Sequence, residues 1–156
     1  MSEVYLGNPN LKKANTAIEF TQEQILEFMK CKEDPVYFAN NYIKIVSLDE
    51  GLTQFHPYHF QEKLINNFHS NRFNICKMPR QTGKSTTVVS YLLHYAVFND
   101  SVNIGILANK AATARELLSR LQTAYENLPK WMQQGIISWN KGSLELENGS
   151  KILAAS

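Results

Sequence analysis

The chain has 156 residues, of which 44% are hydrophobic and 19% are charged, with 7 glycines and 5 prolines. This length is sufficient for one domain with a buried core, and the composition excludes a collagen-like, low-complexity or disordered chain. The net charge is +2, but residues 1–50 carry −3 (5 basic, 8 acidic) and residues 51–156 carry +5 (11 basic, 6 acidic). A surplus this small permits a polyanionic partner without requiring one.

The cysteine pattern and the hydropathy favour a soluble protein in a reducing compartment. Cys31 and Cys76 belong to no Cys-x-x-Cys or Cys/His pattern, which argues against a zinc site and a disulfide framework. The longest mostly apolar stretch, residues 88–98, is much shorter than the ~20 residues of a membrane-spanning helix. The N-terminus also lacks the pattern of a signal peptide, so we expect a soluble cytoplasmic protein without membrane contact.

The N-terminal part of the chain divides into an arm and a helical segment. Residues 1–20 are largely polar and show neither the helical nor the strand period, so we expect a loose arm that packs weakly. Thr21 and Gln24 have the spacing of a capping box and are followed by apolar residues at helical spacing. This pattern predicts a helix over residues 22–31.

A second short helix is expected to begin at Pro35, because Asp34 before it is a typical N-cap residue. Its apolar face is aromatic, which indicates packing in the core. From residue 47 to residue 56 the pattern lapses. We interpret residues 21–55 as one helical segment that precedes the main domain.

The remaining residues alternate between helical and strand-like patterns. The expected elements are a helix from Pro57, a strand over 72–77, a helix over 84–98, a strand over 102–108 in a covered parallel sheet, and a helix over 111–127. Strand-like segments follow at 136–139, 143–147 and 151–155. Asn148-Gly149 between the last two is a strong hairpin signal. This order predicts an α/β fold that opens with a βαβ crossover.

Residues 80–85, with the sequence RQTGKS, lie between an expected strand and an expected helix. A helix N-terminus attracts phosphate through its unpaired backbone N–H groups and the positive end of its dipole. Gly83 permits close approach of the backbone, Lys84 provides a cation for the β- and γ-phosphates, and the Ser85 hydroxyl can bind Mg²⁺. The segment therefore predicts a phosphate-binding loop.

This loop departs from the pattern GxxxxGK[ST], because Met78 occupies the position of the first glycine. The strand and helix expected on its two sides are the context that the pattern requires, so we interpret it as a nucleotide-binding site. Arg80 adds a second cation, which could contact the γ-phosphate and stabilise charge that develops there. The alternative for Arg80 is a surface arginine paired with a carboxylate.

Four stretches together resemble the large terminase subunit of tailed bacteriophages, especially of the myovirus type, which is the ATPase that packages DNA into the prohead. They are PRQTGKSTTVV, FHPYHFQEKL, NIGILANKAATARELLSRL and WNKGSLELENGSKILAAS. The resemblance covers residues from about Thr21 onwards. It implies a P-loop NTPase fold (RecA-like, additional-strand type), with an incomplete parallel sheet, N-terminal helices and a C-terminal β-hairpin, in which residues 56–156 form the first part of the ATPase domain.

The resemblance also implies the ligands and the residues that hold them. In that family a glutamine on the upstream helix recognises adenine, and Gln61 stands at its position; an amide can pair with adenine because it both donates and accepts. ATP and Mg²⁺ are the implied cofactors, with Ser85 as a metal ligand and with Arg80 and Lys84 in catalysis. The residues implied to bind nucleotide are Gln61, Arg80, Gln81, Thr82, Gly83, Lys84, Ser85 and Thr86.

The partners that the resemblance implies are those of a DNA-packaging machine. They are the remaining part of the large subunit, the small terminase subunit, the portal protein and double-stranded DNA. The implied location is the host cytoplasm, with transient binding at the portal of the prohead.

Hydrolysis in that family also requires an acidic residue after a buried strand and a neighbouring glutamate that activates water. After Ser85 no run of four apolar residues ends in Asp or Glu, and Glu145 and Glu147 alternate with leucines of the expected hairpin. We therefore expect nucleotide binding without hydrolysis by these residues alone. We also expect unpaired strand edges and an exposed apolar patch, so that the chain is marginally stable or needs a second chain.

Two other functions fit the same residues. One is an inert fragment that binds motor subunits, and the other is the first lobe of a helicase-like ATPase. For Trp131 and Trp139 packing against the hairpin is favoured over stacking on bases, and the four histidines are interpreted as structural or solvated. Lys110 and Arg115 are candidate contacts with DNA or a neighbouring subunit.

Overall fold

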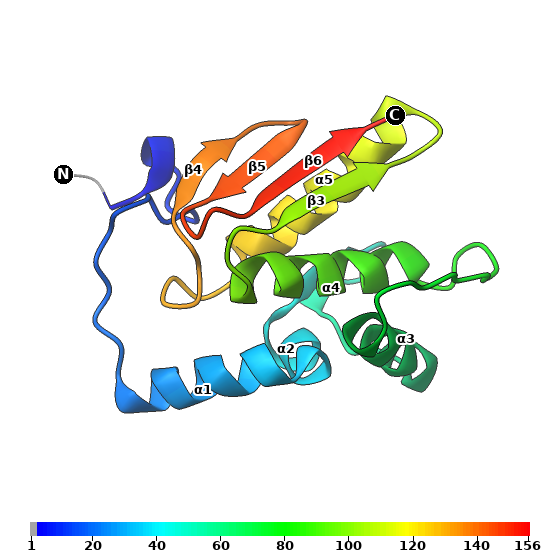
Figure 1. The fold of residues 1–156 in the computed structure, drawn as a ribbon, viewed down its shortest axis with the longest axis horizontal. Helices are drawn as coiled ribbons and strands as arrows, with labels where there is room; N and C mark the ends of the chain where they lie inside the picture. The colour runs from blue at the N-terminus through cyan, green and yellow to red at the C-terminus, as the bar shows by residue number, and fades with distance from the viewer. Residues whose placement is uncertain (1–2) are drawn as a thin grey trace.

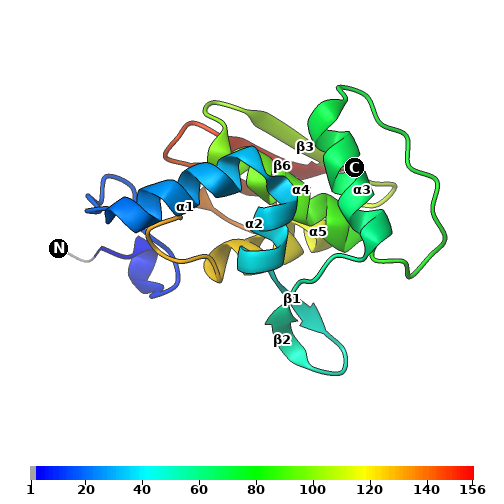
Figure 2. The ribbon, with the colours of Figure 1, turned by 90° about the horizontal axis from the view of Figure 1, so that it is seen from below.

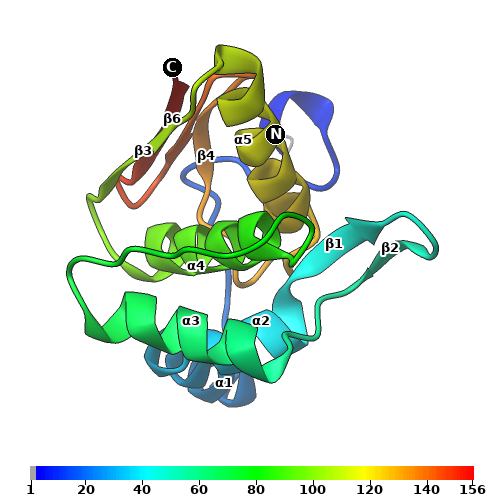
Figure 3. The same cartoon turned by 90° about the vertical axis from the view of Figure 1, so that its right-hand side faces the viewer.

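The computed structural model describes residues 3–156, with a four-stranded mixed sheet at the top of Figure 1 and helices behind and below it. α4 lies between the sheet and a lower layer of helices, and Figure 3 shows this order from the side. The helices are α1 (Gln22–Glu33), α2 (Pro35–Tyr42), α3 (His59–Ser70), α4 (Lys84–Phe98) and α5 (Ala111–Glu126), with a short 3₁₀ turn at Tyr5–Gly7.

The two N-terminal helices begin where the sequence predicts. The Thr21 side chain accepts from the Gln24 N–H at 3.1 Å, and the Gln24 side chain accepts from the Thr21 N–H at 3.0 Å, which completes the capping box of α1. The Asp34 carboxylate caps α2. The aromatic face of α2 is confirmed as core, because Phe38 is fully buried and its ring lies 5.2 Å from that of Phe98.

Between α2 and α3 the chain forms a β-hairpin that the sequence pattern does not reveal. β1 (Lys44–Ser47) pairs antiparallel with β2 (Gly51–Gln54). The hairpin extends away from the body of the molecule, as Figure 2 shows. The lapse in pattern over residues 47–56 therefore hides regular structure, because each strand has only four residues and none of them is fully buried.

The strand expected over residues 72–77 is wrong. These residues are extended but unpaired, and a cavity of about 990 Å³ lies between them, α4 and β3. A strand exists only where a neighbour takes up its N–H and C=O groups, and no described segment does so here. Consequently Phe73 and Ile75, which give the segment its strand-like composition, are 81% and 101% exposed.

The principal sheet has the order β3-β6-β5-β4, so it is mixed and not parallel as expected. Its strands are β3 (Asn103–Leu107), β4 (Ile136–Trp139), β5 (Ser143–Leu146) and β6 (Lys151–Ala155). β3 and β6 are parallel, whereas β5 is antiparallel to both β6 and β4. The Asn148-Gly149 turn between β5 and β6 is confirmed, and Gly149 has a φ of +83° there.

The two faces of this sheet differ in cover. α5 packs on one face, where Leu144, Leu146 and Ile152 are buried (Figure 1). The other face is open, and on it Leu107 and Leu153 are 76% and 56% exposed. The expectation of a covered strand over residues 102–108 is therefore wrong. The expectation of an exposed apolar patch and an unpaired edge, at β3, is confirmed.

The N-terminal arm packs more tightly than we expected. Leu11 is almost fully buried, and Lys13 forms a bridge with Ile136 at the edge of the sheet. The buried Gln133 side chain donates to the Asn10 carbonyl at 2.9 Å and accepts from the Lys12 N–H at 3.0 Å. Within the described residues no helix has the length and apolar character needed to cross a membrane.

Candidate functional site

The loop before α4 presents an open helix N-terminus. Gly83 is the N-cap of α4 and has a φ of +73°, and Gln81 is also left-handed with a φ of +60°. No side chain of the described residues caps this end. The N–H groups of the first turn of α4 are consequently free to bind an anion, as the sequence predicts for this segment.

Hydrogen bonds to one carbonyl fix the geometry of the loop. The Gly83 carbonyl oxygen accepts from the Thr87 N–H at 3.0 Å, from the Thr87 hydroxyl at 2.8 Å and from the Gln61 amide nitrogen at 3.3 Å. The Thr82 hydroxyl donates to the Pro79 carbonyl at 3.0 Å. The loop is therefore tied both to its own helix and to α3, which positions it before any ligand arrives.

Gln61 is buried, with 3% of its surface exposed. Its side-chain oxygen accepts from the Tyr58 N–H at 2.8 Å, while its nitrogen donates to Gly83. It is therefore a structural link between α3 and the loop, and it does not line the cavity at the loop. Recognition of adenine by Gln61 stays a prediction.

The loop residues surround a cavity of about 410 Å³. The lining consists of residues 79–86 together with Arg120 of α5, so the structure brings together every predicted site residue of the loop. Three cations, Arg80, Lys84 and Arg120, face this space, and none of the described acidic side chains lines it. Such a cavity favours a compact polyanion.

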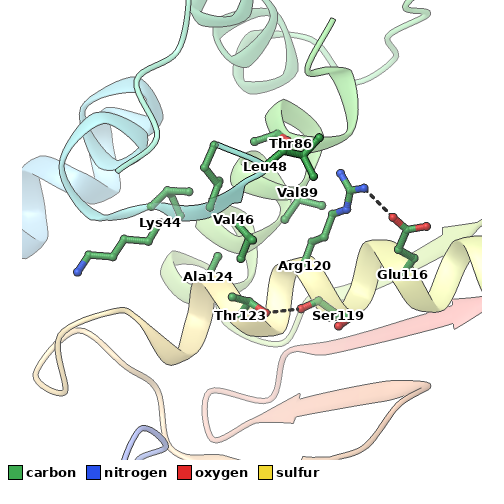
Figure 4. Close-up of a pocket in the computed structure, with 12 residues that line it drawn as sticks. Lys44, Val46, Leu48, Thr86, Val89, Glu116, Ser119, Arg120, Thr123 and Ala124 are labelled. Carbon is green, nitrogen blue, oxygen red and sulfur yellow. Dashed lines mark hydrogen bonds and ion pairs between the residues drawn. The ribbon is translucent and has the colours of Figure 1, made fainter. Parts of the chain in front are cut away.

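Arg120 is the member of this site that sequence reasoning missed. It lies in the stretch NIGILANKAATARELLSRL but has no predicted role there, and only the packing of α5 against α4 places it near the loop. Figure 4 shows its guanidinium directed at Glu116 of the preceding helical turn, with 2.6 Å between Nη2 and Oε1. Arg120 and Thr86 also line an adjoining cavity of about 590 Å³ between the β1–β2 hairpin, α4 and α5.

The donor chemistry at the loop suits a metal that arrives with phosphate. No group of three or more histidines, cysteines or acidic residues gathers anywhere in the described part of the chain. Mg²⁺ is commonly held by one or two protein oxygens and completes its shell with phosphate oxygens and water. The Ser85 hydroxyl, which lines the cavity, can supply such an oxygen.

The remaining candidates of the sequence lie away from the loop cavity. Trp139 pairs with Leu144 of the C-terminal hairpin, and its ring lies 5.7 Å from that of Tyr125, so its expected packing is confirmed. Trp131 also packs within the protein, but against the ring of Tyr42 in α2, at 6.1 Å between centroids, and not against the hairpin. Lys110 and Arg115 are exposed around the start of α5. They line neither the loop cavity nor the other cavities at the start of α4.

The family model described as "Terminase large subunit, T4likevirus-type, N-terminal" matches residues 75–156. The chain belongs to this terminase family. The match contains the loop, α4, α5 and all four strands of the principal sheet, whereas Gln61 and the N-terminal helices precede it. The resemblance drawn from the sequence is confirmed for the matched residues. Membership gives the chain a part in viral DNA packaging, in a complex with other parts of the terminase.

Proposed function

We propose that the chain binds ATP with Mg²⁺ through residues 80–86, as the nucleotide-binding part of the P-loop ATPase of a phage DNA-packaging motor. The observation that carries this proposal is the 410 Å³ cavity at the uncapped start of α4, which is lined by cations alone among the ionisable residues. A triphosphate brings the complementary charge to such a site.

Each loop residue has a role that its chemistry supports. In this proposal Lys84 binds the β- and γ-phosphates, and Arg80 contacts the γ-phosphate. Ser85 supplies one oxygen to the Mg²⁺ that accompanies the nucleotide. Gly83 provides the left-handed turn, with a φ of +73°, that brings the backbone to the start of α4.

The proposal is one of binding, because hydrolysis requires groups that the cavity lacks. None of the described carboxylates lines the loop cavity, so neither a second Mg²⁺ ligand nor a base for the attacking water is at hand. We propose that hydrolysis and DNA movement depend on acidic residues supplied by other parts of the packaging complex, which assembles in the host cytoplasm at the portal of the prohead.

The test is titration of the chain with Mg²⁺-ATP by calorimetry. The wild-type chain is expected to bind, and Lys84→Ala is expected to lower the affinity at least about tenfold, because a charge-assisted contact to phosphate is lost. Lys63→Ala removes an exposed lysine of α3 that does not line the cavity and serves as the control. Equal affinity of Lys84→Ala and the wild type would remove the loop from the proposal.

A second candidate function, binding of another protein segment along the open edge of β3, is favoured by the exposed Leu107 and Ile75. An unpaired strand edge with apolar neighbours is a template for a further strand. Copurification with the rest of the terminase large subunit that survives Lys84→Ala but is lost on Leu107→Lys would support it. Copurification that survives both substitutions would exclude the edge of β3 as the binding site.

A further inference from the structure

The inference concerns Arg120, and it rests on the proposed function. We propose that Arg120 is a phosphate ligand of the nucleotide site, delivered by α5, and that Glu116 holds its guanidinium until the nucleotide is bound.

Arg120 lies at the junction of two cavities. Arg120 and Thr86 line both the loop cavity and the adjoining hairpin cavity, so Arg120 stands where the two cavities meet. The remaining loop-cavity lining comes from residues 79–86, which makes Arg120 the contribution of a separate element. A guanidinium is the side chain best suited to bind two phosphate oxygens at once, because its planar fork matches their spacing.

In the structure the guanidinium of Arg120 is paired with the carboxylate of Glu116. Its Nη2 lies 2.6 Å from Oε1 of Glu116, and Figure 4 shows both side chains above α5 at the rim of the hairpin cavity. Both side chains are largely exposed, at 50% and 61%, and neither forms another hydrogen bond or ion pair with the described residues. An ion pair of this kind between neighbouring turns of one helix is weak and easily exchanged. A phosphate that carries more charge than one carboxylate can therefore displace Glu116.

Glu116 thereby limits the affinity of the site for phosphate. Glu116 lies one helical turn before Arg120, and it lines the hairpin cavity but not the loop cavity. Its pairing with Arg120 neutralises one of the three cations that face the loop cavity. Removal of the Glu116 charge should leave the guanidinium free to bind phosphate.

The test is binding of Mg²⁺-ATP and of Mg²⁺-tripolyphosphate to the full chain, by calorimetry, with four variants. Arg120→Gln is expected to weaken both ligands about tenfold, since a charge-assisted contact to phosphate is lost. Glu116→Gln is expected to strengthen both by about two- to fivefold, the range of a weak surface ion pair. The gain should vanish when Glu116→Gln is combined with Arg120→Gln. Arg115→Gln, a neighbouring exposed arginine outside both cavities, is the matched control.

Each outcome separates this inference from the proposed function. If the wild-type chain binds neither ligand, the proposed function fails and Arg120 loses its role with it. If ATP binds in a manner that depends on Lys84 while Arg120→Gln binds as tightly as the wild type, the inference alone is overturned. Loss of ATP affinity with unchanged tripolyphosphate affinity would also overturn it, because Arg120 would then act on the nucleoside. A gain from Glu116→Gln that persists without Arg120 would overturn the holding role of Glu116.

Discussion

Gln61 and Gly83 are 22 positions apart in the chain and are joined by a hydrogen bond of 3.3 Å from the glutamine amide to the glycine carbonyl. The same carbonyl closes the first turn of α4 through Thr87. Because Gln61 also accepts from the Tyr58 N–H, a single buried amide connects the start of α3 to the start of α4. The shape of the loop is thus determined partly by a residue outside it.

Gly83→Ala is the most direct test of this connection. A Cβ at position 83 would lie 2.5 Å from the Gln61 amide nitrogen, and the φ of +73° is one that alanine adopts only with strain. The left-handed conformation alone costs about 1–2 kcal/mol. We expect a loss of stability of at least this size in urea unfolding, and a loss of ATP affinity of about tenfold or more because the loop must shift.

Gly105→Ala is the control for that substitution, because a Cβ there meets no atom within 4 Å and the backbone is not left-handed. Adding Gln61→Ala to Gly83→Ala removes the steric conflict but not the backbone strain. Because Gln61→Ala alone also loses the hydrogen bonds of Gln61, the double variant is compared with that single variant. In the Gln61→Ala background, Gly83→Ala should cost less stability than in the wild type, but the cost should not vanish. No cost in that background would mean that the clash alone limits position 83, and an unchanged cost would mean that Gln61 moves aside freely.

The arm at the N-terminus offers a second prediction through Gln133. Its amide nitrogen donates to the carbonyls of Asn10, Leu128 and Tyr125 at 2.9, 3.1 and 3.3 Å, and its oxygen accepts from the Lys12 N–H. Gln133→Leu keeps the approximate volume but removes these partners, and only the Tyr125 carbonyl retains another, the Leu128 N–H. We expect a loss of about 2–4 kcal/mol in the free energy of unfolding, since each unsatisfied buried group costs roughly 1–3 kcal/mol.

Limited proteolysis separates this effect from a general loss of packing. If Gln133 holds the arm, cleavage between residues 3 and 20 should accelerate in Gln133→Leu under conditions where the rest of the chain remains intact. Gln134→Leu is the neighbouring control, because the Gln134 amide bonds to the Val97 carbonyl and not to the arm. Equal cleavage of the two variants would contradict the assignment.

Local signals in the sequence predicted those parts of the fold that depend on local chemistry. The capping residue Thr21, the Asp34-Pro35 pair and the Asn148-Gly149 turn each specify a backbone conformation within a few residues. Residues 80–86 are likewise recognisable from the sequence, because Gly83-Lys84-Ser85 is typical of a turn that leads into a helix. α4 begins and ends at the residues predicted.

The parts that sequence reasoning missed depend on contacts between distant segments. Residues 72–77 have the composition of a strand, but pairing requires a neighbour that composition does not reveal. Arg120 reaches the loop only because α5 crosses α4, and no spacing in the chain records that crossing. In the sequence, Gln133 is a polar residue in a segment that connects a helix to a strand. In the structure it is buried, and its amide is fully hydrogen-bonded within the molecule.

The exposed segment at residues 72–77 gives a third prediction. Phe73 and Ile75 are almost wholly exposed, so Phe73→Ser and Ile75→Ser should change the free energy of unfolding by no more than about 0.5 kcal/mol. Both substitutions should reduce self-association, measured by light scattering, because they remove apolar surface beside an unpaired edge. Ile65→Ser replaces a buried residue of α3 and should be severely destabilising. Large destabilisation by Ile75→Ser would mean that this segment packs.

The fourth prediction concerns His94, which lies in α4 among aromatic rings and is almost fully buried. Its Nε2 is 2.8 Å from the Cys31 carbonyl oxygen, whereas its Nδ1 has no hydrogen-bond partner among the described residues. Burial lowers the pKa of His94 from 6.5 to about 4, and the ring of His69, 6.0 Å away, contributes in the same direction. The imidazole is therefore neutral in the folded chain at neutral pH.

Between pH 6.5 and pH 4 the unfolded chain binds a proton at position 94 that the folded chain does not, so the stability contributed by neutral His94 is complete above pH 6.5 and is lost as the pH falls. The pKa difference corresponds to roughly 3 kcal/mol by pH 4. Urea unfolding at pH 7.5, 6.0 and 5.0 should show this decline.

His94→Phe, which keeps an aromatic ring in the cluster, should flatten the decline in stability, whereas His59→Gln, at an exposed position of α3, should not. The carboxylate of Glu27, whose pKa is lowered by hydrogen bonds from Tyr37 and Tyr42, contributes only below about pH 4.5 and does not interfere. An unchanged decline in His94→Phe would assign the acid sensitivity to another group.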